Sequence, residues 1–231
     1  MAQRLVLVPG AWHGAWAWEP ILPALRARGF DPVTVELPST KGAGDLRDDA
    51  GAVCAAVRGS TEPTVVVAHS YAGIPTSEAT AGLAHVTRLV YVCAFMLDTG
   101  QSLTGVLGGA IPPWWDVDDE AGLITVNDAR TAFYGDVDEE LATQWSARLG
   151  AQTTASFQQP QLASGWHTIP STYVVCNQDG AIPPEAQRGM AQQADHVVEL
   201  DSAHSPFASR IEELADAVAA VPAAKQPQVT R

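Results

Sequence analysis

Three side chains that could together perform nucleophilic catalysis follow three apolar segments of the 231-residue sequence. Ser70 follows PTVVVAH, Asp179 lies in VVCNQDG, and His204 lies in ELDSAHSPF. A serine hydroxyl becomes a strong nucleophile when a histidine accepts its proton and an acid orients that histidine. In one fold built on an open parallel sheet, such a triad occurs in the chain order serine, acid, histidine. The sequence therefore predicts Ser70 as nucleophile, Asp179 as acid and His204 as base.

The residues around the serine are typical of a tight turn between a strand and a helix. Ala68 and Ala72 flank Ser70 at two positions to either side, which gives the form small-x-Ser-x-small. Small residues are needed there because the backbone folds back on itself around the nucleophile. Alanine in place of the commoner glycine makes the local motif weaker, so the prediction depends on the strand before it and the helix after it.

One other acid could serve the histidine. Asp98 follows the apolar run LVYVCAFM, so we expect it at the same sheet edge as Asp179. Among the other histidines, His13 lies in the loop PGAWHGAWAW, and we expect it to be a hydrogen-bonded structural residue.

Acyl transfer also requires donors for the negative charge that develops on the carbonyl oxygen. One donor is the backbone N–H of the residue after the nucleophile, here Tyr71, and the other comes from the loop after the first strand. That loop contains Gly10 and Ala11, and we predict the N–H of Ala11 as the second donor.

The elements that must position these residues alternate along the chain. Because continuous apolar strands separated by helices indicate a parallel sheet covered on both faces, we predict an α/β fold with a six-stranded, mainly parallel sheet flanked by helices. The strands are expected at residues 4–10, 32–38, 63–70, 88–95, 171–179 and 196–204, and the helices at 18–29, 45–59, 71–83, 183–194 and 206–221.

A long interruption at about residues 98–167 separates the fourth and fifth strands. Its helical patterning predicts an inserted helical cap over the carboxyl edge of the sheet, where open parallel sheets bind ligands. We expect residues 1–231 to form one domain, with a frayed tail at 222–231. The tryptophans expected to bind a small to medium apolar or aromatic group are Trp12, Trp114, Trp115 and Trp145.

Composition and charge exclude several classes of function. The formal net charge of −13 opposes binding to nucleic acid or to anionic membrane surfaces. The three cysteines, Cys54, Cys93 and Cys176, form no disulfide or metal pattern, and the last two lie in apolar runs, so we expect no metal site and buried thiols. The N-terminus lacks an apolar signal region, and no stretch approaches a membrane span. We therefore expect a cytoplasmic protein with a small-molecule ester substrate, and leave a homodimer open.

Five segments together resemble those of the α/β-hydrolase superfamily, in the branch of plant methylesterases, hydroxynitrile lyases and their bacterial esterase relatives. They are LVLVPGAWHGAWAW, AHSYAG, YVCAFMLD, STYVVCNQDGAIPPEAQ and DSAHSPF. The resemblance implies a six-stranded core with a helical cap, a Ser70–His204–Asp179 triad, oxyanion donors at Ala11 and Tyr71, and no cofactor. Pro9 departs from the histidine that many members carry there, at a position we interpret as structural.

The resemblance covers both esterases and hydroxynitrile lyases, and two positions distinguish these reaction classes. The lyases carry a threonine where this chain has Gly10, and a lysine where it has Ser205. Without that lysine no cation holds a departing cyanide, so we predict an esterase. Gly10 is expected to leave space on the oxyanion loop. A thioesterase or cyclase, a hydroxynitrile lyase and a non-catalytic small-molecule receptor remain alternatives.

Overall fold

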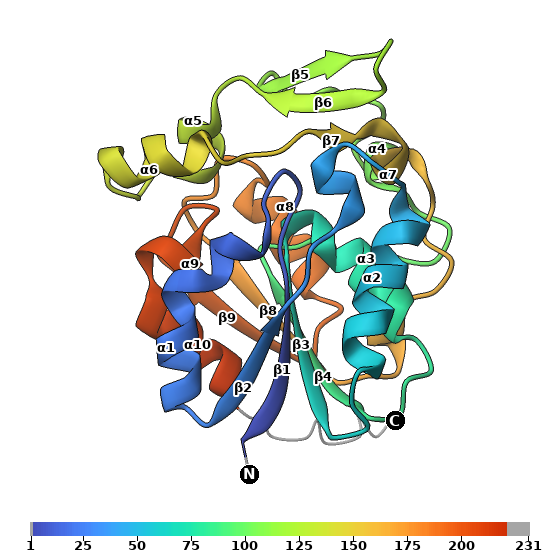
Figure 1. Ribbon diagram of the computed structural model, residues 1–231, viewed down its shortest axis with the longest axis vertical. Coiled ribbons are helices and arrows are strands. Elements are labelled where there is room, and N and C mark those ends of the chain that lie inside the picture. Colours follow the sequence, from blue (N-terminus) through green and yellow to red (C-terminus); the bar gives the residue numbers. More distant parts are fainter. Residues whose placement is uncertain (1, 221–231) are drawn as a thin grey trace, which may run out of the picture.

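Six parallel strands form the central sheet of the computed structural model, which describes residues 2–220 (Figure 1). The strand order is β2-β1-β3-β4-β8-β9, and every neighbouring pair runs parallel. The expected fold class is therefore confirmed. The strands are β1 (Gln3–Val8), β2 (Phe30–Thr34), β3 (Thr64–His69), β4 (Val86–Val92), β8 (Ser171–Cys176) and β9 (His196–Leu200).

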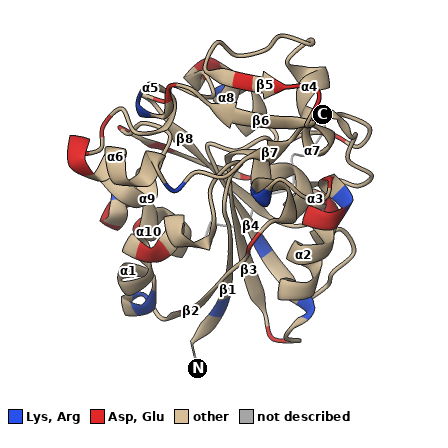
Figure 2. Cartoon of the chain, turned by 45° about the horizontal axis from the view of Figure 1, so that its top comes forward, with Lys and Arg blue, Asp and Glu red and all other residues tan. Residues whose placement is uncertain are grey.

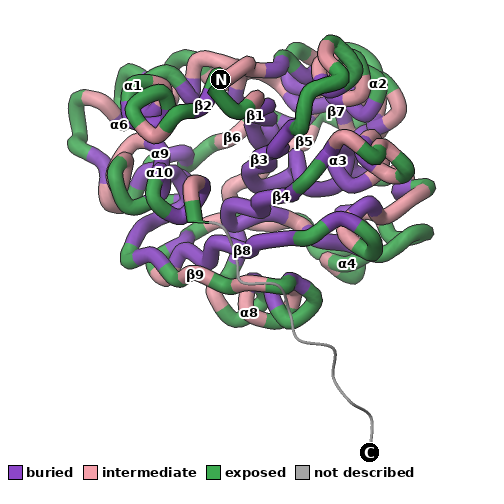
Figure 3. The backbone as a smooth tube through the Cα atoms, turned by 90° about the horizontal axis from the view of Figure 1, so that it is seen from below, coloured by how far each residue is buried: buried purple, intermediate pink, exposed green. Residues whose placement is uncertain are grey.

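Helices cover both faces of this sheet. On one face α1 packs against α10, and on the other α2 packs against α3, while α8 lies beside β8 (Figures 1 and 3). Every residue of β3 and β8 is buried, and in β1 and β4 the exposed residues lie near the amino end of the strand (Figure 3). These helices are α1 (Leu22–Ala27), α2 (Leu46–Arg58), α3 (Gly73–Thr80), α8 (Pro184–Ala191), α9 (Pro206–Ser209) and α10 (Ile211–Ala219).

Three of the expected helices differ in detail from the prediction. A 3-10 helix, η1 (Ala15–Ile21), precedes α1, and another, η3 (Ser70–Ala72), precedes α3. The last predicted helix is interrupted at Arg210, whose extended φ of −133° separates α9 from α10. The predicted tail at 222–231 lies outside the described residues.

The 98–167 segment lies over the carboxyl ends of the strands (Figure 1). It contains short helices, as expected, and also a three-stranded antiparallel sheet, β5-β6-β7. The hairpin β5–β6 turns at Gly122, which has a positive φ of 68° that favours glycine. The elements are α4 (Leu103–Val106), β5 (Trp115–Asp118), β6 (Leu123–Val126), α5 (Ala129–Phe133), α6 (Glu139–Ser146), β7 (Gln152–Thr153), α7 (Thr154–Gln158) and η4 (Gly165–His167).

The charged residues lie mainly on the outer elements. Figure 2 shows acidic positions on α6, α10 and β5, away from the middle of the sheet. No helix within residues 2–220 has the length and apolar character needed to cross a membrane. The predicted buried thiols are confirmed, since Cys93 and Cys176 are fully buried and all three cysteines are free.

Candidate active site

Ser70, His204 and Asp179 form one continuous chain of hydrogen bonds. The Ser70 Oγ lies 2.9 Å from His204 Nε2, and His204 Nδ1 lies 2.6 Å from Asp179 Oδ2. Because a carboxylate only accepts, Nδ1 carries the proton and Nε2 is free to accept the serine proton. The three residues come from the ends of β3, β8 and β9, and all are buried. The structure thus brings together the three residues that chain order predicted.

Ser70 is held in a conformation that L-residues rarely adopt. Its φ is 55°, in the left-handed region, directly after β3. The Ser70 carbonyl accepts a hydrogen bond from Phe95 N at 3.0 Å, which fixes the turn from the neighbouring strand. The position with no room for a side chain is Gly73, where a Cβ would overlap the Phe95 carbonyl oxygen. The two alanines therefore suffice at the flanking positions, while the glycine is needed one residue later.

Strained backbone of this kind gathers at the site. The non-glycine residues with positive φ among the described residues are Trp12, Ser70 and Cys93, with φ of 63°, 55° and 36°. They follow β1, β3 and β4, three adjacent strands. Such outliers cost of order 1–3 kcal/mol each and cluster where function requires them.

The Asp179 carboxylate is surrounded by donors. Its Oδ1 accepts the N–H groups of Ala181 and Ile182 at 2.8 and 2.9 Å, and its Oδ2 accepts Gln187 Nε2 at 2.8 Å besides the histidine. Gln187, on α8, is fully buried, and sequence reasoning gave it no role. These bonds fix the orientation of the acid and hence of the His204 ring.

The rival acid, Asp98, is engaged elsewhere. Its Oδ1 lies 2.8 Å from His167 Nε2, and both side chains are about half exposed, at 55% and 53%. The Asp179 side chain has an exposed fraction of 0% in its pair with His204. The geometry therefore favours Asp179 as the partner of His204.

A second histidine holds the backbone of His204. His69 Nε2 donates to the His204 carbonyl oxygen at 2.8 Å, and the Cys93 thiol donates to the same oxygen at 3.4 Å. Burial lowers the pKa of His69 well below its ordinary value, with the charge of His204 as the next cause. His69 therefore stays neutral and connects β3 to the loop that carries His204.

The predicted oxyanion loop is tightly packed. Ala11 and Tyr71 line the same cavity as Ser70. A Cβ on Gly10 would lie 2.6 Å from His69 Nδ1 and 2.8 Å from the Ser70 Cβ. The expectation that Gly10 leaves open space is therefore wrong, because the turn after β3 already fills that volume.

His13 is a structural residue in this arrangement, as expected. Its Nδ1 donates to the Ala11 carbonyl at 2.9 Å, so its Nε2 accepts the Tyr134 hydroxyl at 2.9 Å. Burial lowers the pKa of His13 from 6.5 to about 4, against a smaller opposing effect of the bond to Ala11. A neutral His13 thus links the Ala11 carbonyl to the Tyr134 hydroxyl.

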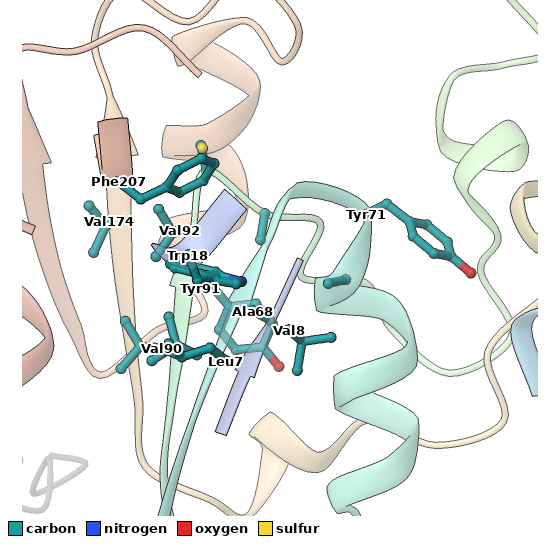
Figure 4. Packing of buried hydrophobic residues seen from close by; sticks show 14 of the residues in the cluster. Leu7, Val8, Trp18, Ala68, Tyr71, Val90, Tyr91, Val92, Val174 and Phe207 are labelled. Carbon is teal, nitrogen blue, oxygen red and sulfur yellow. The ribbon is translucent and has the colours of Figure 1, made fainter. Parts of the chain in front are cut away.

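A buried polar network reaches Tyr71, one predicted oxyanion donor, and Trp12, which follows the other, Ala11. The Tyr71 hydroxyl donates to Asp49 Oδ2 at 2.7 Å, and Ser39 donates to both carboxylate oxygens of Asp49. Gln152 Nε2 donates to Ser39 Oγ at 2.7 Å, and Gln152 Oε1 accepts Trp12 N at 3.3 Å. Burial raises the pKa of Asp49, and the bonds from Ser39 and Tyr71 oppose that rise. In Figure 4 the Tyr71 ring points away from the apolar cluster around Leu7, in keeping with this separate partner.

Trp12 joins the oxyanion loop to the 98–167 segment. Its indole Nε1 donates to the Ile124 carbonyl at 2.8 Å, and its own carbonyl accepts Gly150 N at 2.7 Å. Together with the Gln152 bond, these contacts fix the loop to the hairpin and to the strand β7 beyond it.

The inner pocket is the small cavity of about 30 Å³ above Ser70. Three of the four tryptophans predicted to bind substrate, Trp12, Trp114 and Trp115, line it, together with Phe157. Trp145 does not, because its ring packs against Trp16 and Phe207, with centroids 5.1 and 6.0 Å away. The pocket wall is therefore aromatic on the side of the hairpin.

A cluster of potential metal ligands coincides with the triad. The ligating atoms of His69, Cys93 and His204 lie within 4.8 Å of one another. Both ring nitrogens of His204 are already bonded, to Ser70 and Asp179. A metal ion there would break the hydrogen-bonded chain, so the donor set fits a triad better than a metal site.

A family model and curated relatives match most of the chain. The model of the alpha/beta hydrolase family matches residues 5–217. The chain is 31% identical to the alpha/beta hydrolase nvfD of Aspergillus novofumigatus, over 89% of this chain and 90% of that protein. It is 30% identical to methylesterase 9 of Arabidopsis thaliana, over 93% of this chain and 96% of that protein.

Solved structures show the same fold. Polyneuridine aldehyde esterase superposes with a TM-score of 0.81 at 19% identity, covering 94% of this chain and 98% of its own. A pyrethroid hydrolase from Sphingobium faniae gives a TM-score of 0.81 at 21% identity, covering 95% and 96%. The fold and the family match define this chain as a member of the alpha/beta hydrolase family. Within that family it belongs to the branch of the plant methylesterases, and it is an enzyme of the carboxylic ester hydrolase class.

Proposed function

We propose that the chain is a serine esterase that cleaves small to medium apolar or aromatic carboxylic esters through an acyl-enzyme. The observation that carries the proposal is the hydrogen-bonded chain from Ser70 through His204 to Asp179 at the floor of an aromatic pocket. In this assignment Ser70 is the nucleophile, His204 the base and Asp179 the acid that holds the imidazole tautomer.

The first half of the reaction acylates the serine. His204 Nε2 takes the Ser70 proton as Oγ attacks the ester carbonyl, and Asp179 stabilises the imidazolium that forms. The carbonyl oxygen becomes an oxyanion, which accepts the backbone N–H groups of Ala11 and Tyr71. Amides in the first turn of a helix have no intrahelical acceptor, so that of Tyr71 is available to the substrate. Loss of one such donor costs about 3–4 kcal/mol of transition-state stabilisation.

The second half of the reaction releases the carboxylic acid product. The C–O bond to the alcohol breaks, and the alcohol takes the proton from His204. Water then donates a proton to His204 and attacks the acyl carbonyl, and collapse of the intermediate returns the proton to Ser70. We assign the 98–167 segment as the cap that closes this site, since its hairpin and α7 supply the aromatic wall of the inner pocket.

The lyase alternative depends on Ser205. The side chain is fully buried, and its Oγ has no hydrogen-bond partner within residues 2–220. An uncharged hydroxyl stabilises a departing cyanide much less than a lysine ammonium would. We therefore expect no cleavage of mandelonitrile above the spontaneous rate.

The test is ester turnover with Ser70→Ala as the blank. Wild-type enzyme should release nitrophenol from p-nitrophenyl acetate and should be labelled at Ser70 by a fluorophosphonate. Ser70→Ala should lower kcat by roughly 10⁴–10⁶-fold, because members of a triad act as a unit. Turnover of the variant within about tenfold of wild type would remove Ser70 from the mechanism, and cyanide release without ester hydrolysis would favour the lyase.

A further inference from the structure

A second cavity of about 350 Å³, here the outer pocket, lies between the segment after β4 and helix α8. Four residues line both cavities, namely Phe95, Leu107, Ala181 and Ile182. The outer pocket therefore adjoins the inner pocket at Ala181 and Ile182, which lie shortly after Asp179, and at Phe95 and Leu107.

The two volumes decide what each pocket can hold. Pockets for small organic ligands usually measure about 300–1,000 Å³, and a single water needs roughly 10–15 Å³ of such space. The inner pocket, at about 30 Å³, has room for roughly two or three water-sized groups, which is about the size of the reacting carbonyl and its nearest atoms. An apolar ester of ordinary size must extend out of it, and the outer pocket is the adjoining space of ligand size.

The walls of the outer pocket specify the chemistry of its occupant. They are mainly apolar, with Met96, Leu97, Val106 and Met190 among them. Methionine side chains adapt to irregular ligands because they are unbranched and flexible. Asp98 is the charged residue of the lining, which opposes an anionic ligand, and it is already bonded to His167.

From these observations we infer that the outer pocket is a specificity site that binds an uncharged, apolar chain of the ester substrate, while the carbonyl reacts in the inner pocket. The inference rests on the proposed esterase function. It gives the enzyme a preference for esters with one long apolar chain over esters in which both parts are short.

The chain offers a matched pair of glycines for the test. Gly189, on α8, lines the outer pocket, and a Cβ there would meet no atom within 4 Å. Gly51, on α2, has an equally open Cβ position and lines neither pocket. Gly189→Phe should therefore place a ring in the outer pocket without a backbone clash, and Gly51→Phe is the control. Ala186→Phe, one turn earlier on the same helix, provides a second variant that fills the pocket.

The measurement is kcat/KM in two series. One lengthens the acyl group of p-nitrophenyl esters from acetate to octanoate, and the other lengthens the alcohol of acetate esters from methyl to octyl. In one of the two series, the kcat/KM of wild type should rise roughly threefold to fourfold for each methylene buried, until the outer pocket is filled. Gly189→Phe and Ala186→Phe should lower the ratio of long-chain to short-chain kcat/KM by at least tenfold, and Gly51→Phe should keep the wild-type ratio.

Two outcomes overturn the inference. The first is a chain-length profile that is the same in Gly189→Phe, Ala186→Phe and Gly51→Phe. The second is a wild-type preference for the shortest ester in both series. Absence of hydrolysis by wild type in every series would instead refute the proposed function, and this inference with it.

Discussion

Gln187 donates its Nε2–H to the same Asp179 oxygen, Oδ2, that accepts the proton-bearing Nδ1 of His204, at a distance of 2.8 Å. The glutamine is itself fixed, because its Oε1 accepts Cys176 N at 2.9 Å and its Nε2 also donates to the Ile182 carbonyl at 2.8 Å. The acid is thereby anchored to both the last residue of β8 and the turn that follows it.

This contact predicts a large effect of charge at position 187. Gln187→Glu would place a second carboxyl at hydrogen-bond distance from Asp179, and two such groups cannot both stay ionised in a buried site. We expect kcat to fall by ~10²–10⁴-fold, approaching the loss of the acid itself. Gln187→Met, similar in length and uncharged, is the control and should lose less. Equal kcat values for the two folded variants would show that Gln187 does not act through Asp179.

Substitution of the two candidate acids should have very different effects on kcat. Asp179→Asn changes the tautomer of the base, and such a change is worth up to ~10⁴ in kcat. Asp98→Asn disturbs a half-exposed pair with His167 and leaves the bond between Asp179 and His204 intact. For a short ester that does not enter the outer pocket, kcat should therefore stay within a few-fold of wild type. Steady-state kinetics with one aryl ester compares them, and the reverse ranking would move the acid to the segment after β4.

Gly10 should tolerate no side chain. Gly10→Ala would push a methyl group against His69 Nδ1 and the Ser70 Cβ, and overpacking of this kind costs typically ~1–3 kcal/mol. We expect both a lower free energy of unfolding in urea and a lower kcat, since the nucleophile itself is displaced. Gly51→Ala, in the open middle of α2, is the matched control and should stabilise by up to ~1 kcal/mol. A Gly10→Ala variant as stable and active as wild type would contradict the packing described.

Lowering the pH should destabilise the folded state, and part of this effect should come from protonation of His13. Burial lowers its pKa in the folded state from 6.5 to about 4, so the unfolded chain takes up the proton first as the pH falls. The stabilisation is complete above pH ~6.5 and is lost between that value and about 4, with a slope of up to ~1.4 kcal/mol per pH unit. Urea unfolding at several pH values should show a shallower dependence for His13→Gln than for wild type. Identical slopes would mean that the folded protein accepts a proton on His13 as readily as the unfolded chain.

The features predicted correctly from the sequence are those that depend on the order of strands and residues along the chain. Ser70, Asp179 and His204 were found because each follows an apolar run, and the ends of parallel strands must meet at one edge. Gln187 was missed since a glutamine in an amphipathic helix carries no local signal of the carboxylate it contacts. The hairpin β5–β6 was missed because four residues per strand are too few to distinguish a strand from a helix.

Predictions that needed distances between remote segments were less accurate. Gly10 was interpreted as open space, but the turn at His69 and Ser70, some 60 residues later, fills that volume. Trp145 was placed at the substrate on residue type alone, and its neighbours Trp16 and Phe207 are set by tertiary packing. Residue type and order identify the chemistry, whereas the shape of the pocket depends on contacts that no local pattern encodes.

The three hydrogen bonds of Trp12 couple the proposed cap to the loop that carries the predicted oxyanion donor Ala11. Trp12 follows Ala11 directly, and its bonds to Ile124, Gly150 and Gln152 all go to the proposed cap. A hairpin that swings away from the sheet must either break these bonds or drag the Ala11 amide out of position. With the hairpin open, the enzyme could admit or release ligand. It could not stabilise an oxyanion through the Ala11 amide until the hairpin returns.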